Sequence, residues 1–408
     1  MNPLVRNTAQ LLTANVLAQA IGLLVYPILT RMYSPAAFGE LNVFLSWAGI
    51  LTLLSTVELQ YAIVLPREDE KALRVFLAGM VCLVTVSLAT VLISIPVRLP
   101  LLAPFVFLSG LWTLLNYYLT RQQRFGLISG YQMTQSLSGA LLKILFGWLA
   151  LSSGLIFATT AAPLIGLLLI LLLYAKPYNL LTSKPHNLLT SKPQNLLEVV
   201  REYRNFPLYS LPRALTNNLG NNLPAIILAP LFGLTQLGFF SMAITLAFRP
   251  INIVSTSVYQ VLFQRTTELV NQRQSIRRLV LGFVGKTLAV VLPCFALLYF
   301  VLPPLCEWLL GTGWEQSGIY IRWMLPWLLL SSMVAPICYL ADIFQQQKIG
   351  LFFEVLLLLA RMVGMLLGIW QHRFLWAVAG YSLLSAVVIF LQLLWYLSLV
   401  RRYERTLA

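Results

Sequence analysis

Long apolar stretches separated by short polar connections make up most of this sequence. Each stretch has roughly the 20 residues that a helix needs to cross the hydrocarbon core of a bilayer. Several stretches follow one another so closely that they must form helical hairpins. The pattern therefore predicts an all-α polytopic membrane protein with twelve transmembrane helices, at residues 9–29, 38–65, 75–97, 101–120, 129–150, 153–174, 207–229, 238–262, 280–303, 318–341, 350–371 and 374–400.

The composition supports this prediction. Hydrophobic residues make up 59% of the 408 residues and charged residues only 10%, whereas soluble domains have about 45–50% and about 25%. No polar segment reaches the roughly 50 residues of a soluble domain. The four cysteines and two histidines have no spacing that suggests a disulfide, metal or cofactor site. Without a phosphate-binding glycine loop or a Ser/His/Asp set, we expect no catalytic residue and no enzyme.

Basic residues lie mostly in alternate connections between the predicted helices. Cytoplasmic loops of membrane proteins retain an excess of Lys and Arg. With the N-terminus inside, 19 basic residues fall on the cytoplasmic side and three, Arg31, Arg98 and Arg373, on the other. The sequence therefore predicts an even number of spans with both termini cytoplasmic. The net charge of +15 follows from this topology, so it indicates contact with anionic membrane lipids and requires no nucleic acid.

An octapeptide, NLLTSKP plus one residue, occurs twice and begins a third time within residues 178–198. Its polar composition predicts a flexible connector. We expect an N-terminal six-helix bundle at 1–175, a cytoplasmic linker at 176–205 and a C-terminal six-helix bundle at 206–408. Two short echoes suggest that the bundles are parallel repeats, as in some transporters. LTRMYSPAAFGEL at 29–41 aligns Gly39 with Gly238 in LAPLFGLTQLGFF at 228–240, and YYLTRQQRFG at 117–126 resembles LADIFQQQKIG at 340–350.

Six basic side chains fall inside predicted spans, where a charge costs at least about 2.5–3.5 kcal/mol and usually marks a functional site. At about 1.5 Å of rise per residue, Arg249, Arg361 and Lys143 lie near the middle of the bilayer. The other three lie nearer to a surface, where they either extend to lipid headgroups or face a wet cavity. In chain order the six are Lys143, Arg213, Arg249, Lys286, Arg322 and Arg361.

Two acids, Glu58 and Glu354, also fall inside predicted spans. Glu354 and Arg361 are seven residues apart and share one face of a helix, so one interpretation is an ion pair. The other is that these acids carry a coupling proton or Na⁺. Six cations against two acids leave surplus positive charge, which favours an anionic ligand.

A stripe of asparagines follows the linker, in a region that also contains Pro207, Pro212 and Pro224. These prolines permit a bent or broken helix. The amides, at spacings of one helical turn, either form hydrogen bonds between helices or bind the hydroxyl groups of a sugar. The stripe consists of Asn217, Asn218, Asn221 and Asn222.

Three stretches resemble the Wzx-type oligosaccharide flippases, in the polysaccharide-transporter branch of the multidrug/oligosaccharidyl-lipid/polysaccharide exporter superfamily. RMYSPAAFG contains Arg31, Phe38 and Gly39, and LFGLTQLGFFSMAITLAFRPINIVSTSVYQVLF contains Gly238 and Arg249. LLGTGWEQSGIYIRWMLPW carries a Gly-x-x-Trp pattern. The resemblance extends over nearly the whole chain.

This resemblance implies a MATE-like fold, in which two six-helix bundles surround a central cavity. It implies a monomer in the bacterial inner membrane that flips undecaprenyl-diphosphate-linked oligosaccharides to the periplasmic leaflet. The glycan would serve cell-surface polysaccharides such as O-antigen lipopolysaccharide, alongside polymerase and chain-length proteins. No cofactor is expected beyond a possible H⁺ or Na⁺. Of the six membrane cations, Arg249 alone matches the family motifs, and Arg31 lies at the outer mouth.

The expected substrate site combines these observations. The surplus cations would bind the diphosphate and the amides the sugars. A multidrug antiporter of the same fold remains an alternative, although it requires a net acidic cavity. A polymerase or ligase would need catalytic residues in a large outer loop, and the largest, 304–317, has only Glu307 and Glu315. The candidate residues are Arg249, Arg361, Lys143, Arg213, Asn217, Asn218, Asn221 and Asn222, with Glu58 and Glu354 for ion coupling.

Overall fold

A computed structural model describes residues 3–174 and 201–407 of the chain, with side chains from Leu17 to Leu172 and from Arg201 to Leu407. The octapeptide repeat and most of the expected linker lie outside these ranges. The described part is helical and contains no β-strand. The chain divides into two compact units. Unit 1 comprises Met1–Tyr33 and Glu40–Asn218, and unit 2 comprises Ser34–Gly39 and Leu219–Ala408.

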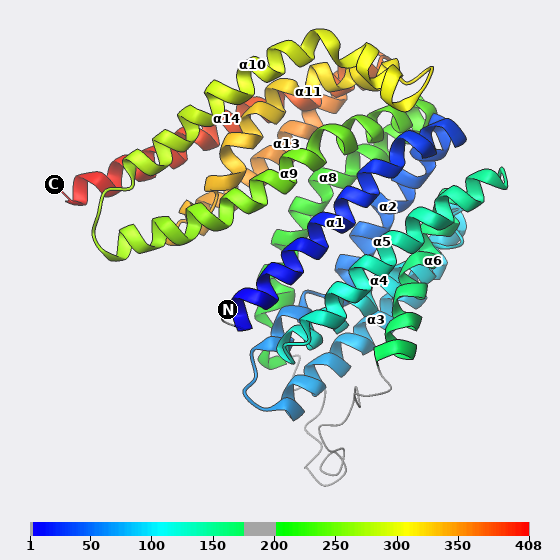
Figure 1. The fold of residues 1–408 in the computed structure, drawn as a ribbon, viewed down its shortest axis with the longest axis horizontal. Coiled ribbons are helices and arrows are strands. Elements are labelled where there is room, and N and C mark those ends of the chain that lie inside the picture. Colours follow the sequence, from blue (N-terminus) through cyan, green and yellow to red (C-terminus); the bar gives the residue numbers. More distant parts are fainter. Residues whose placement is uncertain (1–2, 175–200, 408) are drawn as a thin grey trace. The chain divides into compact units, whose positions relative to one another are not determined.

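Unit 1 is a bundle in which α1 and α6 pack on α5 and α3 packs on α4 (Figure 1). Most of α2 and the start of α8 also belong to it. A short 3₁₀ segment, η1, lies against both α3 and α4. The elements are α1 (Pro3–Met32), α2 (Pro35–Thr56), η1 (Leu59–Val64), α3 (Asp69–Val97), α4 (Leu102–Arg121), α5 (Phe125–Trp148), α6 (Gly154–Leu169), η2 (Ile170–Tyr174) and η4 (Phe206–Ser210).

Unit 2 is built around α11, which packs against α9, α10 and α14 (Figure 1). In the most apolar window of each helix, 67% of the α11 residues but only 11% of the α10 residues are buried. Helix α11 is therefore interior, whereas α10 is peripheral. The elements are α8 (Leu211–Phe232), α9 (Leu234–Asn271), α10 (Arg277–Leu310), α11 (Glu315–Val334), η5 (Ala335–Ile337), α12 (Leu340–Ile343), α13 (Gln347–Trp370) and α14 (Phe374–Leu407).

Small residues let α13 and α14 approach closely. A Cβ on Gly364 would lie 2.4 Å from the carbonyl oxygen of Gly380, and one on Gly368 would lie 2.2 Å from the backbone nitrogen of Ala377. Gly364 and Gly368 form a Gly-x-x-x-Gly pattern, which is typical of helix pairs packed backbone to backbone in membranes.

Each of the twelve predicted spans coincides with a helix of the described chain. Nine of these helices are long and apolar enough to cross a membrane: α2, α3, α4, α6, α9, α10, α11, α13 and α14. The remaining three predicted spans correspond to α1, whose described apolar part is Leu17–Met32, and to α5 and α8. The predicted all-α, multi-pass architecture is confirmed.

The second predicted span, 38–65, is too long, because α2 ends at Thr56. Val57 and Glu58 both adopt positive φ angles, 50° and 61°, and η1 follows. The hydroxyl of Ser55 donates to the carbonyl of Thr52 at 2.7 Å. Such a bond offers the backbone an alternative to continued helix. The apolar run therefore contains a helix and a separate buried segment.

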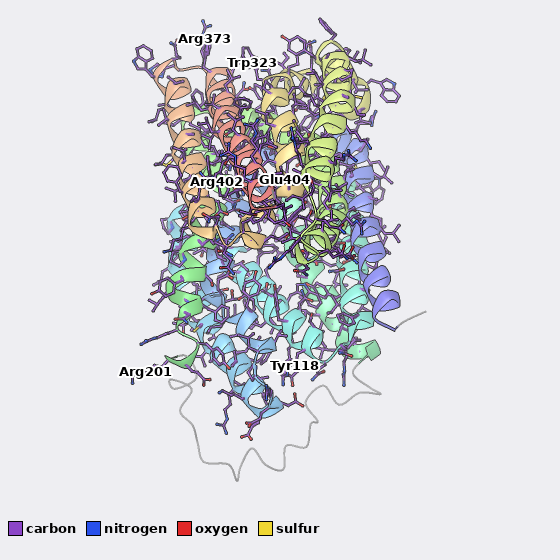
Figure 2. The ribbon with its side chains drawn as sticks, turned by 90° about the vertical axis from the view of Figure 1, so that its left-hand side faces the viewer. Tyr118, Arg201, Trp323, Arg373, Arg402 and Glu404 are labelled. Atoms are coloured by element: carbon purple, nitrogen blue, oxygen red, sulfur yellow. The ribbon has the colours of Figure 1, made fainter. Side chains whose placement is uncertain are left out.

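The two ends of unit 2 have different charged and aromatic side chains. Figure 2 shows Trp323 and Arg373 at the opposite end of the unit from Arg402 and Glu404. Glu404 caps α10: its Oε1 accepts hydrogen bonds from the Ile276 and Arg277 amides at 2.9 and 3.1 Å and from the Ser275 hydroxyl at 3.0 Å. The carboxylate satisfies amides that a helix start leaves without intrahelical partners.

The first residues of α2 and α9 cross at two glycines within unit 2. A Cβ on Gly39 would lie 1.9 Å from the carbonyl oxygen of Leu234, and a Cβ on Gly238 would lie 1.8 Å from that of Pro35. Leu234 follows Pro35 by 199 residues, as Gly238 follows Gly39. One contact is therefore made twice with the roles of the two helices exchanged, which explains why the sequence echo aligns these glycines.

Trp314 covers this crossing and is 2% exposed. Its ring meets those of Phe38 and Phe239 edge to face, at centroid distances of 5.4 and 5.5 Å. The turn before Trp314 needs glycine, since Gly311 and Gly313 have φ angles of 105° and 89°. All three stretches that carry the family resemblance thus meet at one packing junction of unit 2.

Replacing either crossing glycine with alanine should destabilise the protein. The added methyl group meets backbone, which cannot move aside as a flexible side chain can, so we expect Gly39→Ala and Gly238→Ala each to lower stability by about 1–3 kcal/mol or more. Gly282→Ala on α10 is the matched control, because its methyl group meets no heavy atom within 4 Å. Thermal unfolding in detergent measures the difference, and equal melting temperatures for all three variants would contradict the crossing.

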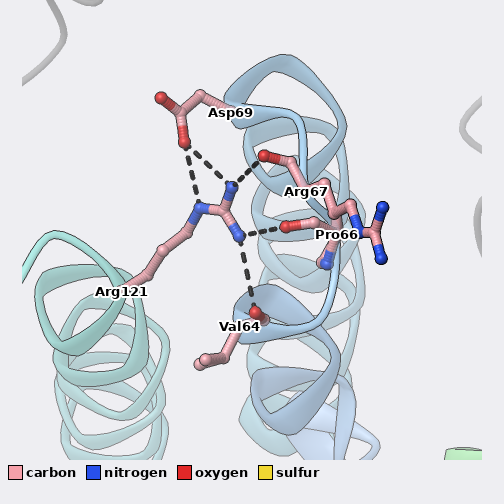
Figure 3. Close-up of polar contacts among 5 residues, drawn as sticks. All are labelled: Val64, Pro66, Arg67, Asp69 and Arg121. Atoms are coloured by element: carbon pink, nitrogen blue, oxygen red, sulfur yellow. Dashed lines mark hydrogen bonds and ion pairs between the residues drawn. The ribbon is translucent and has the colours of Figure 1, made fainter.

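Arg121, at the end of α4, holds the segment that joins η1 to α3 (Figure 3). Its Nε and Nη2 donate to Asp69 Oδ1 at 3.1 and 2.9 Å. Nη1 donates to the carbonyls of Val64, at 3.4 Å, and Pro66, and Nη2 to that of Arg67 at 3.3 Å. The planar guanidinium satisfies several carbonyls that lack helical partners, which a lysine ammonium cannot do in the same geometry.

We expect Arg121→Lys to destabilise unit 1 by about 2 kcal/mol, because hydrogen bonds to charged groups contribute about 1.5–3 kcal/mol. Lysine keeps the positive charge but lacks the planar set of N–H donors that arginine has. Arg67→Lys is the control, since the exposed side chain of Arg67 points away from Arg121 and only its carbonyl is used (Figure 3). Urea or thermal unfolding in detergent tests this, and a stable Arg121→Lys variant would show that charge alone suffices.

Candidate functional site

The strongest polar cluster within unit 2 surrounds Arg361 of α13. Its Nη1 donates to the carbonyl of Gly220 at 3.1 Å and to Asn221 Oδ1 at 3.0 Å, both on α8. Its guanidinium also lies over two aromatic rings, 5.5 Å from the centroid of Trp327 on α11 and 5.1 Å from that of Tyr381 on α14. One cation therefore joins four helices.

The charge of Arg361 is buried among neutral partners. The residue is 7% exposed, and no carboxylate of the described residues forms an ion pair with it. Its Nε is also buried and lacks a hydrogen-bond acceptor within the described chain. Amide, carbonyl and ring contacts lower the energy of a buried cation without cancelling its charge. The charge of Arg361 is therefore not neutralised by an ion pair with a described carboxylate.

Arg361 packs closely against Gly220 of α8. A Cβ at Gly220 would lie 3.2 Å from the Arg361 Nη1 atom, so a side chain here would require the guanidinium to shift by a few tenths of an ångström. Gly220 lies between the two asparagine pairs of α8. That glycine inside a polar stripe was the one sequence signal for this contact.

The structure brings together two of the predicted site residues, Arg361 and Asn221. Asn218 belongs to unit 1, where its amide donates to the carbonyl of Gly49 on α2 at 3.4 Å. Asn217 is exposed and Asn222 is half-buried on the same helix. The stripe therefore serves helix–helix hydrogen bonding at Asn218 and the buried cation at Asn221.

The other predicted cations are distributed over both units. Arg249 is exposed on α9 of unit 2. In unit 1, Lys143 is half-buried on α5 and its carbonyl accepts a 2.8 Å bond from the Tyr33 hydroxyl, while Arg213 is exposed on α8. Arg31 is exposed and folds back on α1, where its Nη1 donates to the carbonyl of Pro27 at 2.6 Å.

The two predicted coupling acids occupy different environments. Glu58 of unit 1 is 4% exposed and sits at the left-handed break between α2 and η1. Burial raises the pKa of its carboxyl, and a hydrogen bond involving Gln60 lowers it in part. Glu354 is half-buried on α13 of unit 2. An ion pair between Glu354 and Arg361 is not present, because Arg361 turns to α8 instead.

Sequence reasoning missed the aromatic partners of Arg361. Trp327 lies on α11, which is distant from Arg361 in the sequence. Tyr381 lies on α14, which is separated from α13 by a turn. No spacing rule connects an arginine with rings on other helices, so only the packing identifies them. Arg121 directly follows the predicted span 101–120, and nothing in that pattern indicates its carbonyl partners.

Comparison with known proteins identifies the family of the chain. The sequence profile of a family described as polysaccharide biosynthesis protein matches residues 28–318. The chain belongs to this family. The match covers the crossing glycines, Trp314 and the predicted Arg249, and it confirms the family resemblance found in the sequence. No curated protein matches the chain by sequence.

Solved structures show which fold this member of the family has. An inward-facing multidrug resistance MATE family transporter of the MOP superfamily aligns with a TM-score of 0.67 and 12% identity over 96% of each chain. The lipid II flippase MurJ, in an inward closed conformation, aligns with a TM-score of 0.66 and 10% identity over 97% of this chain and 90% of MurJ. A MOP superfamily transporter from Pyrococcus furiosus aligns with a TM-score of 0.56 and 12% identity, over 98% of this chain and 96% of its own.

The predicted MATE-like fold is confirmed by these alignments. These neighbours are described as transporters and a flippase. The protein is a multi-pass membrane protein of the polysaccharide biosynthesis family.

Glu58→Gln should stabilise unit 1 in a pH-dependent way. Because the folded state raises the pKa of this carboxyl, it binds the proton more tightly than the unfolded chain does. Ionisation then costs stability as pH rises from the usual glutamate value of about 4.3 through the raised value. We expect the Glu58→Gln variant to melt at a higher temperature than the wild type at pH 8, and at the same temperature at pH 4.

Thermal unfolding in detergent at the two pH values measures this effect. Glu68→Gln is the control, since it makes the same substitution at an exposed glutamate of the same connection. A wild type that is as stable as Glu58→Gln at pH 8 would show that water or a cation stabilises the ionised carboxylate.

Proposed function

We propose that this protein is a flippase for undecaprenyl-diphosphate-linked oligosaccharide repeat units. It would move them from the cytoplasmic to the periplasmic leaflet of a bacterial inner membrane by alternating access, for cell-surface polysaccharide synthesis. The family match over residues 28–318 carries this proposal. The fold supports it, because a lipid II flippase shares that fold.

The charge distribution fits a phosphorylated cargo. Arg361 is a buried cation whose direct partners in the described chain are neutral, so it contributes positive potential to unit 2. Arg249 is exposed, so a ligand can reach its guanidinium, whereas Arg361 is only 7% exposed. We therefore assign direct diphosphate contact to Arg249 and positioning of Asn221 and α8 to Arg361.

The remaining candidates have supporting roles in this proposal. Lys143 and Arg213 of unit 1 would contact phosphate or lipid headgroups, and the asparagines of α8 would bind sugar hydroxyls. Burial raises the pKa of the Glu58 carboxyl, so we assign proton coupling to Glu58. Glu354 would serve a Na⁺-coupled cycle.

A multidrug antiporter is the second candidate, because a multidrug resistance MATE family transporter has the same fold. Cationic drugs require negative charge in their site. The Arg361 cluster supplies positive charge instead, and the chain as a whole carries +15. Resistance to cationic dyes in cells that express the protein would favour this second function.

Arg249→Ala should reduce leaflet transfer about tenfold to a hundredfold, since hydrogen bonds to charged groups contribute about 1.5–3 kcal/mol and each 1.4 kcal/mol corresponds to tenfold. Transfer of a fluorescent lipid-diphosphate oligosaccharide across reconstituted proteoliposomes measures this. Arg265→Ala is the control on the same helix, because Arg265 pairs locally with Glu268 at 3.0 Å. Arg249→Lys should retain part of the activity.

Folding must be checked alongside transfer. Arg249→Ala should keep the melting temperature of the wild type, whereas Arg361→Gln should lower melting temperature and transfer together, because it loosens α8. Wild-type transfer in a folded Arg249→Ala variant would remove Arg249 from the site. Equal loss in Arg265→Ala would show a general effect of surface charge.

A further inference from the structure

Two pockets follow the peripheral helix α10 in unit 2. The larger, of about 500 Å³, lies between α9 and α10, and Ser332 and Pro336 of α11 and η5 also line it. Among the described residues that line it, Lys286 carries the only charge and most of the others are apolar. Its volume is in the range of small-molecule sites, which is about 300–1,000 Å³.

The second pocket, of about 360 Å³, lies farther along α10, against α11. Arg322 is the charged residue in its described lining, and Phe295 lines both pockets. The Nη2 of Arg322 donates to the carbonyl of Phe300 at 3.0 Å, and its guanidinium lies 5.3 Å from the ring centroid of Tyr299. Its Nε is buried and has no hydrogen-bond acceptor in the described chain.

Together the pockets form a track along α10, with a cation at each end. From Lys286 to Tyr299, under Arg322, the helix advances about 20 Å at 1.5 Å per residue. The hydrocarbon core of a bilayer is about 30 Å thick. Side chains as long as Lys and Arg extend beyond their own Cα positions, so the two charges can reach the headgroup regions of opposite leaflets.

The walls of this track include side chains that the rest of the described chain leaves uncovered. Val254 and Val290 line the larger pocket and are each 63% exposed. The lining includes the hydroxyls of Ser255, Thr287 and Ser332, too few for a sugar, which needs many hydrogen-bonding partners. An aliphatic chain fits such a lining, and a phosphate fits the cation at either end.

We propose that this track binds the isoprenoid phosphate part of the lipid-linked cargo, with the chain along α10 and a phosphate near Lys286 or Arg322. The inference rests on the proposed function, because it assigns the tail of the same substrate. Lys286 would hold the phosphate on the side predicted to be cytoplasmic, and Arg322 on the opposite side.

The two cations favour a moving lipid over a resident phospholipid. A phospholipid that stays in one leaflet needs a cation at one end of an apolar pocket. A lipid that changes leaflet places its phosphate at the headgroup depth of each leaflet in turn. This track has a cation near each of its two ends. Polyprenyl phosphate also has a single chain, whereas a phospholipid would place two chains against pockets of about 500 and 360 Å³.

Binding of undecaprenyl phosphate to the purified full-length protein tests this directly, by native mass spectrometry in detergent with phosphatidylglycerol as the competitor. We expect Lys286→Ala to weaken binding about tenfold, equivalent to about 1.4 kcal/mol. Val290→Trp should weaken it at least as much, because the indole fills the larger pocket while Lys286 is kept. Leu297→Trp is the matched control, since Leu297 is a 68% exposed residue of α10 that lines neither pocket.

Several results would overturn the assignment. Equal binding by Val290→Trp, Leu297→Trp and wild type would show that the pocket is not used. Phosphatidylglycerol displacing undecaprenyl phosphate at equal concentration would identify a general anionic lipid site. If Val290→Trp loses undecaprenyl phosphate binding but transfers the lipid-linked oligosaccharide normally, the track is not on the transport route and the flippase function stands. If wild type binds the lipid but never transfers it, the flippase function fails and the binding site remains.

Discussion

Burial of the Arg361 guanidinium determines how four helices of unit 2 meet. A charge removed from water is costly, and the guanidinium offsets part of this cost through its contacts with Gly220 and Asn221 on α8 and with the Trp327 and Tyr381 rings. Each partner is neutral. The cluster is therefore held together by a charge that it does not cancel, and this charge still acts on its surroundings because electrostatic interactions are strong in a medium of low polarity.

The residues that reveal the family are mainly packing residues. Gly39 and Gly238 allow two helix starts to cross at backbone distance, and Trp314 covers the crossing against Phe38 and Phe239. Such a junction tolerates almost no change in volume, since protein interiors are close-packed. A motif of this kind therefore reports the fold. In the proposed function, other side chains recognise the cargo, and Arg249, which is exposed, is the one that we assign to its diphosphate.

The sequence predicted helices well because hydropathy acts over about 20 residues and needs no knowledge of neighbours. It failed at Thr56, where the apolar run continues through a helix end marked by neither Gly nor Pro, and where the backbone of Val57 and Glu58 turns left-handed. The sequence indicated Arg361 because a charge inside a membrane span is costly, and it indicated Asn221 because the asparagines of the stripe are spaced by one helical turn. Their contact, and the rings that enclose the guanidinium, depend on how α8, α11, α13 and α14 pack, which periodicity within one helix does not encode.

Helix α11 connects the polar interior of unit 2 with its apolar periphery. It supplies Trp327 to the Arg361 cluster, and it supplies Arg322 and Ser332 to the pockets along α10. Because α11 is mostly buried while α10 is mostly exposed, a shift of α11 would alter both places, whereas α10 has fewer neighbours to resist movement. A cargo with a charged head and an apolar tail presents two different chemistries at once. Because α11 contacts both the Arg361 cluster and the pockets along α10, it provides a physical route by which a ligand bound at one of these places affects the other.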